Sequence, residues 1–371
     1  MRSCVLARGS RLGSIGLTAR PPALQQGVIA TKAAVLAAPY DMNIKDMDTP
    51  SLGGDKDVLV KVRATGICGS EIHAYRGKHP RRRPPVVLGH EVAGEVVATG
   101  RRVRHVKVGD RVVIEPQVSC GVCAECLAGN HNLCSEKKLL GSSEWSGGFG
   151  EYVVVPEETC YEIAPDLPMH HAALAEPLAV GVHAARRLNT PPDHRIVVMG
   201  AGPIGLLTVV ALRSVGARHI AVVDAKKFNT EVGLRVGASF GVHVTSAPIE
   251  EAVKSQTGWS TVDIAVVAAG NPSCVAGALS LTRAHGQVLL LALFEEPVSV
   301  DLMHIQSREL YVSGSKMYTS EDFRTAVEML NAGQVPCDEI VSYAVSLQDV
   351  PAVMRYLNKS PEGVIKVSVV N

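Results

Sequence analysis

The feature that most restricts the fold is a glycine-rich turn between a buried apolar run and a helical pattern. Residues 196–199 are continuously apolar, as in a strand covered on both faces. The sequence G-x-G-x-x-G follows at 200–205, and residues 203–215 have helical spacing. Three more apolar runs repeat this unit, at 220–223, 263–268 and 287–293. Strands that alternate with helices predict a parallel, doubly wound α/β sheet.

The glycine-rich turn predicts a dinucleotide site. Its glycines permit a tight turn and let the backbone approach a pyrophosphate, which then lies at the helix N-terminus. Asp224 follows Gly205 by nineteen residues, at the expected end of a strand. A carboxylate there accepts hydrogen bonds from ribose hydroxyls and repels a 2′-phosphate, which favours NAD over NADP; the alternative is an ordinary strand-end cap. The expected cofactor-binding residues are Gly200, Gly202, Pro203, Ile204, Gly205, Asp224 and Leu293.

Four of the nine cysteines form a compact group with metal-binding spacing. They follow the pattern C-x₂-C-x₂-C-x₇-C, at Cys120, Cys123, Cys126 and Cys134. Four thiolates so close in sequence suit one tetrahedral structural Zn²⁺. Disulfide pairs are one alternative, although the sequence has no secretory signal. An iron–sulfur cluster is another, because cysteine spacing alone does not fix the metal.

A second group of metal-binding side chains precedes these cysteines. Cys68 ends one expected strand, and His90-Glu91 begins another. A thiolate, an imidazole and a carboxylate can hold a catalytic Zn²⁺ with an open position. In isolation, Cys68 and His90 would each more often be buried structural residues. Their occurrence beside a dinucleotide fold and a four-cysteine lobe favours the metal site.

The part of the chain before the dinucleotide motif has a different texture. Between residues 31 and 177, short β-branched segments are separated by glycine and proline, which predicts a barrel-like β domain. These segments are 58–62, 92–98, 111–114 and 152–155. After residue 318 we expect a helix at 321–331 and a final strand at 364–369 that completes this first domain.

Charge and hydropathy exclude two classes of partner. The chain has 37 Lys+Arg against 36 Asp+Glu, a net charge of +1, which argues against nucleic-acid binding. No apolar run approaches the roughly 18 residues that cross a bilayer. Residues 1–40 hold five basic and no acidic side chains. We interpret residues 1–30 as a mitochondrial transit peptide or a disordered extension, so the expected compartment is the cytoplasm or, with a transit peptide, the mitochondrial matrix.

Taken together, these motifs resemble the zinc-dependent medium-chain alcohol dehydrogenases over about residues 31–371. The sequences G-I-C-G-S and G-H-E, the four-cysteine lobe, G-A-G-P-I-G and the strand-end aspartate occur in the family's order. The resemblance implies a GroES-like catalytic domain and a Rossmann NAD-binding domain. The implied boundaries are 31–180 for the catalytic domain with a zinc lobe at 120–134, 181–317 for the Rossmann domain, and 318–371 for the C-terminal part of the catalytic domain.

The resemblance also assigns roles to residues. Cys68, His90 and Glu91 match the catalytic-zinc positions, and the four cysteines match the structural zinc. The stretch 175–183 is similar to polyol dehydrogenases of the sorbitol, xylitol and arabitol type, in which the glutamate matching Glu176 binds the metal or its water. The implied proton relay runs through Ser70 and His73, and Glu71 is expected to hydrogen-bond His90.

The implied reaction is hydride transfer from a polyol or secondary alcohol to NAD, giving a ketose or ketone, in a homodimer or homotetramer. Close alternatives are threonine, butanediol and sugar-acid dehydrogenases. A non-enzymatic NAD-binding or redox-sensing protein is an alternative of another class. Two departures concern the substrate: Met317 stands where sorbitol-type enzymes carry arginine, and the run 81–83 is three arginines. We predict a solvated loop there, with attraction of an acidic or phosphorylated sugar as the alternative.

Overall fold

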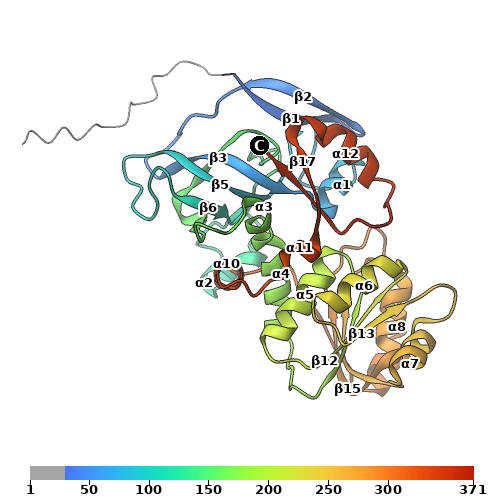
Figure 1. The fold of residues 1–371 in the computed structure, drawn as a ribbon. Helices are drawn as coiled ribbons and strands as arrows, with labels where there is room; N and C mark the ends of the chain where they lie inside the picture. The colour runs from blue at the N-terminus through green and yellow to red at the C-terminus, as the bar shows by residue number, and fades with distance from the viewer. Residues whose placement is uncertain (1–29) are drawn as a thin grey trace, which may run out of the picture.

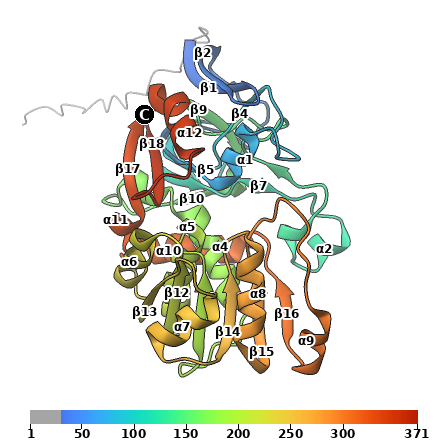
Figure 2. The ribbon, with the colours of Figure 1, turned by 90° about the vertical axis from the view of Figure 1, so that its right-hand side faces the viewer.

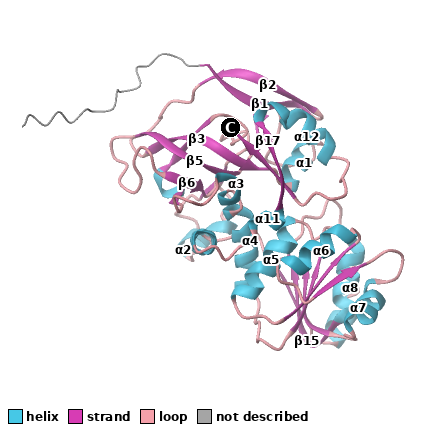
Figure 3. Ribbon diagram, viewed as in Figure 1, coloured by secondary structure: helices cyan, strands magenta, loops and turns pink. Residues whose placement is uncertain are grey.

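The computed structural model describes residues 30–371, which form a β-rich domain and an α/β domain (Figure 1). The predicted extension of residues 1–30 lies outside the described residues except for Ala30. Helices gather around the α/β domain, whereas strands dominate the other (Figure 3). Within residues 30–371, no helix is both long and apolar enough to cross a membrane.

The β-rich domain is built on one large sheet. Its strand order is β10-β6-β5-β3-β18-β17, and β9 also pairs with β3. Its strands from the first half of the chain are β3 (Asp57–Gly66), β5 (Glu91–Thr99), β6 (Arg111–Ile114), β9 (Tyr152–Pro156) and β10 (Cys160–Glu162). The four predicted segments 58–62, 92–98, 111–114 and 152–155 all lie within these strands, which confirms them.

Two small sheets flank the large one. The first has the order β2-β1-β4, with β1 (Ala30–Ala38), β2 (Asp41–Asp48) and β4 (Val86–Val87). The second pairs β7 (Gln117–Val118) with β8 (Lys138–Leu139) at the base of the four-cysteine segment. Buried residues of β1 and β4 share one apolar cluster with α1 (Gly69–Tyr75) and α12 (Val350–Leu357).

The end of the chain returns to the β-rich domain, as predicted. After α10 (Ser320–Asn331) and α11 (Cys337–Ile340), β17 (Val341–Ser346) pairs with β18 (Lys366–Val370). β18 runs antiparallel to β3, with Ser368 opposite Gly66. The C-terminal strand therefore lies beside the end of β3. The predicted metal ligand Cys68 follows the end of β3 by two residues.

The α/β domain contains a six-stranded parallel sheet in the order β13-β12-β11-β14-β15-β16 (Figure 2). Its strands are β11 (Arg195–Met199), β12 (His219–Asp224), β13 (Phe240–His243), β14 (Val262–Val267), β15 (Thr282–Leu290) and β16 (Tyr311–Gly314). Its helices are α5 (Pro203–Ser214), α6 (Lys227–Arg235), α7 (Ile249–Thr257), α8 (Pro272–Leu281) and α9 (Leu302–Ser307). The strand order reverses at β11, and ligands of such sheets bind outside the carboxyl ends of the strands at this point.

The predicted end of one strand lies three residues beyond the end of the strand in the structure. We predicted a strand at 287–293, but β15 ends at Leu290, so Leu293 lies in the following loop with 67% of its surface exposed. The apolar sequence continues past the strand end, and for this reason the pattern alone did not show where the strand stops.

The two domains share a continuous apolar core. Helix α4 (Ala175–Arg186) packs against both α5 and α10, and α3 (Met169–Ala172) precedes it. One cluster of buried side chains includes Leu178 of α4, Leu207 of α5 and Phe323 of α10, together with Ala64 and Ala93 of the large β-sheet. Helix α4 thus connects the domains, and Glu176 lies in its first turn.

Candidate active site

The turn between β3 and α1 positions Cys68. β3 ends at Gly66, where an added Cβ would lie 1.8 Å from Glu91 Oε2, so a larger residue would collide with the start of β5. Cys68 then forms the N-cap of α1, and the Glu71 carboxylate accepts a 2.8 Å hydrogen bond from the Cys68 backbone N–H. The cap fixes the thiol at the helix start, two residues before Ser70.

His90 lies at the centre of the predicted metal ligands. Ligand atoms of Cys68, Glu71 and His90 lie within 4.8 Å of one another, and so do those of His90, Glu91 and Glu176. The ring Nδ1 forms a short hydrogen bond with Glu71 Oε1, and Nε2 is 4.0 Å from Glu176 Oε2. The expected contact between Glu71 and His90 is therefore present, and the predicted ligands from separate parts of the chain converge.

Glu71 controls which ring nitrogen of His90 carries the proton. Burial alone would raise the pKa of Glu71, but the charge and hydrogen bond of His90, together with the Arg82 charge, lower it to about 2. An ionised carboxylate only accepts hydrogen bonds, so Nδ1 of His90 must be the donor. In a neutral ring this leaves the lone pair of Nε2 for a metal, on the side of Glu176.

Glu176 is held by a tyrosine. Its Oε1 accepts a 2.8 Å hydrogen bond from the hydroxyl of Tyr318, and both side chains are buried. Burial raises the pKa of Glu176, and burial together with the charge of Glu176 raises that of Tyr318 well above its usual value. The phenol is therefore a neutral donor that orients the carboxylate without neutralising it.

Glu91 has a different partner, which the sequence analysis missed. Lys366 of β18 donates to Glu91 Oε1 at 2.5 Å and to the Ile67 carbonyl at 3.2 Å. The other carboxylate oxygen, Oε2, is buried without a hydrogen-bond partner among the described residues. The available signal was a lone lysine within the apolar final strand.

The two proposed relay residues lie near the junction of the domains. Ser70 is 8% exposed, and its hydroxyl oxygen is 3.4 Å from Nη1 of Arg82. His73 is partly buried, with Nδ1 at 3.5 Å from Glu295 Oε1 in the loop that follows β15 of the α/β domain. The prediction of a solvated loop at 81–83 is wrong for Arg82, which is 6% exposed because it turns inward toward Ser70 and Glu71.

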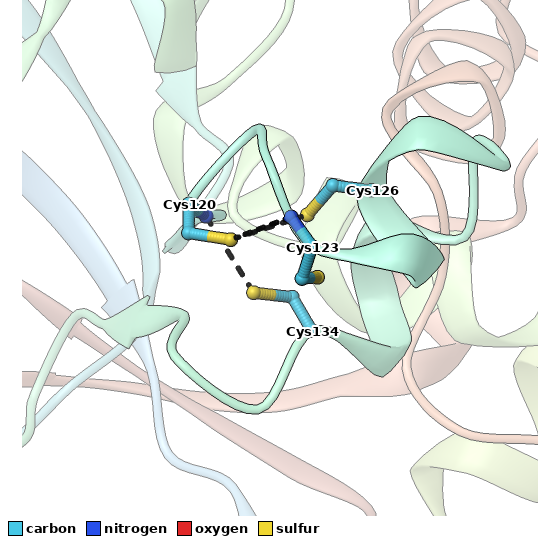
Figure 4. A group of neighbouring side chains, drawn as sticks. All are labelled: Cys120, Cys123, Cys126 and Cys134. Carbon is cyan, nitrogen blue, oxygen red and sulfur yellow. Dashed lines mark hydrogen bonds between the residues drawn. The ribbon is translucent and has the colours of Figure 1, made fainter.

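The four cysteine sulfurs converge in the lobe that contains α2 (Ala124–Leu127) and η1 (His131–Leu133) (Figure 4). All four lie within 4.8 Å of one another, and no cysteine in residues 30–371 forms a disulfide. A hydrogen bond from His131 lowers the pKa of Cys126 to about 6, which favours the thiolate. Four convergent thiols without disulfides fit the donor set of a structural Zn²⁺.

The glycine loop fits a dinucleotide. Gly202 is the N-cap of α5, and a Cβ there would meet no atom within 4 Å, so the space above the helix start is open. Asp224 accepts hydrogen bonds from the backbone N–H groups of Ala201 and Lys226, each at 2.8 Å. Its oxygens retain lone pairs for ribose hydroxyls. The Lys226 ammonium instead donates to Ser360 and to the Pro361 carbonyl.

Comparison with known proteins gives consistent results for both domains. Residues 54–166 match the alcohol dehydrogenase GroES-like domain family, and residues 203–332 match the zinc-binding dehydrogenase family. Sorbitol dehydrogenase of Bacillus subtilis is 33% identical over 329 residues, which cover 87% of this chain and 92% of that protein. L-idonate 5-dehydrogenase of Vitis vinifera is 33% identical over 318 residues, 84% of this chain and 86% of that protein.

A solved structure of similar fold is a zinc-binding dehydrogenase of Sinorhizobium meliloti with NADP bound. It superposes with a TM-score of 0.86 at 32% identity and covers 92% of this chain and 100% of that one. The agreement spans both domains, so the arrangement of the β-rich and α/β domains is also shared.

Proposed function

This chain belongs to the zinc-dependent medium-chain alcohol dehydrogenase family, and from that premise we propose how its residues oxidise a polyol or another secondary alcohol. It is an oxidoreductase acting on CH–OH donors, with a GroES-like domain and a Rossmann domain. The observation that carries the proposal is the convergence on His90 of a thiol and carboxylates from separate segments. We assign residues 31–180 and 318–371 to catalysis and 181–317 to cofactor binding.

The donor set around His90 suits a catalytic zinc held by Cys68, His90, Glu91 and Glu176. When bound, Zn²⁺ supplies Lewis acidity that makes a substrate hydroxyl easier to deprotonate, and NAD accepts the hydride. Glu71 fixes the ring of His90, and Tyr318 fixes the carboxylate of Glu176. Cys120, Cys123, Cys126 and Cys134 would hold the second, structural zinc.

Ser70 and His73 provide a path for the released proton. Ser70 lies two residues after Cys68 and is nearly buried, so its hydroxyl can accept a proton from a substrate hydroxyl bound beside the thiolate. His73 is on the same helix, partly exposed, and paired with Glu295. An imidazole at a solvent boundary can pass protons to water near neutral pH.

The cofactor proposed for this reaction is NAD rather than NADP. Gly200, Gly202, Pro203, Ile204 and Gly205 form the turn under the pyrophosphate. Asp224 is the one acid at the end of β12, and the hydrogen bonds of Lys226 to residues 360 and 361 hold that cation in other contacts. A ribose 2′-phosphate would therefore meet an uncompensated carboxylate. Leu293, exposed in the loop after β15, is proposed to contact the nicotinamide end.

We propose that the protein forms a homodimer or homotetramer through the edge of the parallel sheet. β16 is one of the two edge strands of this sheet, and Tyr311 and Val312 on it are exposed. Leu302 and Met303 of α9 extend this apolar surface. Unpaired edge strands with apolar side chains favour pairing with a second copy.

The reaction is tested by following NADH formation over a panel of C4–C6 polyols, with zinc content measured in parallel. We expect activity with at least one polyol and its loss after removal of metal by a chelator. Cys68→Ser should abolish turnover and leave NADH binding intact, because the cofactor turn lies in the other domain.

Cys274→Ser is the matched control, since Cys274 is a partly buried thiol of α8 with no place in either zinc group. Full activity after complete metal removal would contradict the Lewis-acid mechanism. Absence of NADH formation with every polyol, diol and hydroxy acid would favour the non-enzymatic NAD-binding alternative.

A further inference from the structure

Of the three consecutive arginines, Arg81 and Arg83 are exposed to solvent, whereas Arg82 is buried. Arg81 donates to the carbonyls of Lys137 and Ser135, each at 2.9 Å, and Arg83 donates to the Pro80 carbonyl at 2.9 Å. Both are exposed and hold the loop in place. Arg82 points inward and is 6% exposed. A buried arginine normally forms an ion pair, and each of its N–H groups normally has a hydrogen-bond acceptor.

The hydrogen bonds of Arg82 are incomplete. Its Nη1 lies 3.4 Å from Ser70 Oγ and 3.0 Å from Nε2 of His79. Its Nε is buried without a hydrogen-bond partner among the described residues, and the nearest carboxylate oxygen, Glu71 Oε1, is 3.8 Å away. That oxygen already accepts from His90. Glu71 therefore offsets part of the positive charge but leaves the Nε–H without an acceptor.

His79 contacts Nη1 of Arg82 rather than Nε, and it is not a fully satisfied acceptor even there. Its Nδ1 lies 3.2 Å and 3.1 Å from the backbone N–H groups of Arg81 and Arg82, both of which are donors. Burial, together with the charge of Arg82, lowers the pKa of His79 to about 4, so the ring carries one proton at pH 7. If Nδ1 accepts from the backbone, the proton is on Nε2 and faces the Nη1 donor of Arg82. Either tautomer leaves one of these contacts without an acceptor.

The unsatisfied Nε lies on one of the guanidinium edges to which carboxylates bind. Nε and the neighbouring Nη2 present the parallel N–H pair to which a carboxylate binds with two hydrogen bonds. A buried donor without an acceptor costs free energy, which an anionic ligand would recover. The same guanidinium contacts Ser70, the proposed proton acceptor of the reacting hydroxyl. An anion bound by Arg82 would therefore lie close to the carbon that is oxidised.

We propose that Arg82 binds a carboxylate of the substrate, so that this enzyme prefers a hydroxy acid of the sugar-acid class to a neutral polyol. The inference rests on the proposed function and specifies its substrate. The alternative role for Arg82 is structural, in which it only compensates Glu71. A structural role predicts that substitution affects acids and neutral polyols equally.

The test compares substrates that differ only at one terminal group: gluconate with sorbitol, and erythronate with erythritol. Arg82→Met removes the charge, Arg82→Lys keeps it without the planar fork, and Arg83→Met is the exposed control. For the wild type we expect a higher kcat/KM for each acid. Arg82→Met should lower that value by about ten- to a hundredfold more for the acids than for the matching polyols, mainly through KM. Arg82→Lys should be intermediate.

A binding measurement separates this inference from the reaction itself. Gluconate titrated into the enzyme–NADH complex should change the nucleotide fluorescence of the wild type and of Arg83→Met, and should bind at least about tenfold more weakly to Arg82→Met. If no substrate is oxidised, the proposed function fails, and this titration still decides the role of Arg82.

Three results would overturn the proposal. One is an unchanged ratio of acid to polyol kcat/KM in Arg82→Met, which would leave Arg82 with a structural role. The second is gluconate binding that Arg82→Met does not weaken. The third is preference for sorbitol 6-phosphate over gluconate, which would replace the carboxylate with a phosphate.

Discussion

Replacing Lys366 by methionine tests the buried charge beneath the proposed metal site. The side chains of Lys366 and Glu91 are 2% and 0% exposed, and their charged atoms are 2.5 Å apart. Burial would lower the pKa of Lys366, but the charge of Glu91 raises it above its usual value, so the ammonium keeps its charge at pH 7. Methionine keeps the length and volume of the stem but removes the ammonium, leaving a carboxylate with no cationic partner.

The expected loss follows from the contacts of Glu91. Among residues 30–371, Lys366 is the hydrogen-bond donor that Oε1 would lose, and Oε2 already has none. Breaking a buried pair by removing one partner costs about 3–5 kcal/mol of unfolding free energy. Replacing both members by neutral groups removes the uncompensated charge, so Lys366→Met with Glu91→Gln should be more stable than Lys366→Met alone.

The assay is denaturant unfolding of the metal-free protein at pH 7, so that zinc affinity does not enter the comparison. Lys107→Met is the control, because Lys107 forms an ion pair with Asp110 at 3.1 Å but is exposed; we expect no measurable change. A loss below about 1 kcal/mol for Lys366→Met, or a double variant as unstable as the sum of the single ones, would refute the reasoning.

Three further outcomes are expected. Tyr318→Phe removes the hydroxyl that orients Glu176, and kcat/KM should fall by about tenfold with zinc content unchanged. Asp224→Ala should raise the ratio of NADP to NAD kcat/KM, and an unchanged ratio would argue against its role at the ribose. Burial would raise the pKa of Asp322, but the hydrogen bond from His183 lowers it to about 2. Its contribution of about 1–2 kcal/mol is present above pH 4 and lost as the pH falls toward 2. Unfolding curves of the wild type and Asp322→Asn should therefore converge at acid pH.

The sequence was most informative where partners lie close together along the chain. The strand β11, the glycine turn and helix α5 are consecutive, so local periodicity and turn chemistry predict all three. The four cysteines span fifteen residues, and their spacing alone predicts that they can meet at one ion. In both cases the contacts form within one short segment, and little depends on how the domains pack.

Partners far apart in sequence could not be predicted in this way. Lys366 and Glu91 are 275 residues apart, and their pairing depends on β18 lying beside β3. The burial of Arg82 is a second example, because the sequence R-R-R gives no sign that the middle residue turns inward. An extended loop sends successive side chains in different directions, and only the contacts of the folded loop determine which one faces Ser70.

The carboxylates around His90 differ in what compensates their charge. Glu71 bonds to His90 itself and lies 3.8 Å from a guanidinium, and Glu91 bonds to the ammonium of Lys366. Glu176 bonds to the neutral hydroxyl of Tyr318. Glu176 is therefore the carboxylate whose charge has no cationic hydrogen-bond partner among the described residues. Its Oε2 is also the oxygen found 4.0 Å from Nε2 of His90.

This difference in charge compensation indicates which carboxylate would gain most from binding a metal ion. A divalent cation beside Cys68 and His90 would find in Glu176 the carboxylate that still needs a positive charge, because a ligand already bonded to an ammonium gains less from a metal. Arg82 is instead a cation whose charge is only partly compensated, because Glu71 interacts with both the guanidinium and His90. One buried group thus requires a cation and one requires an anion. The proposed zinc ion would meet the first requirement, and the proposed carboxylate of the substrate would meet the second.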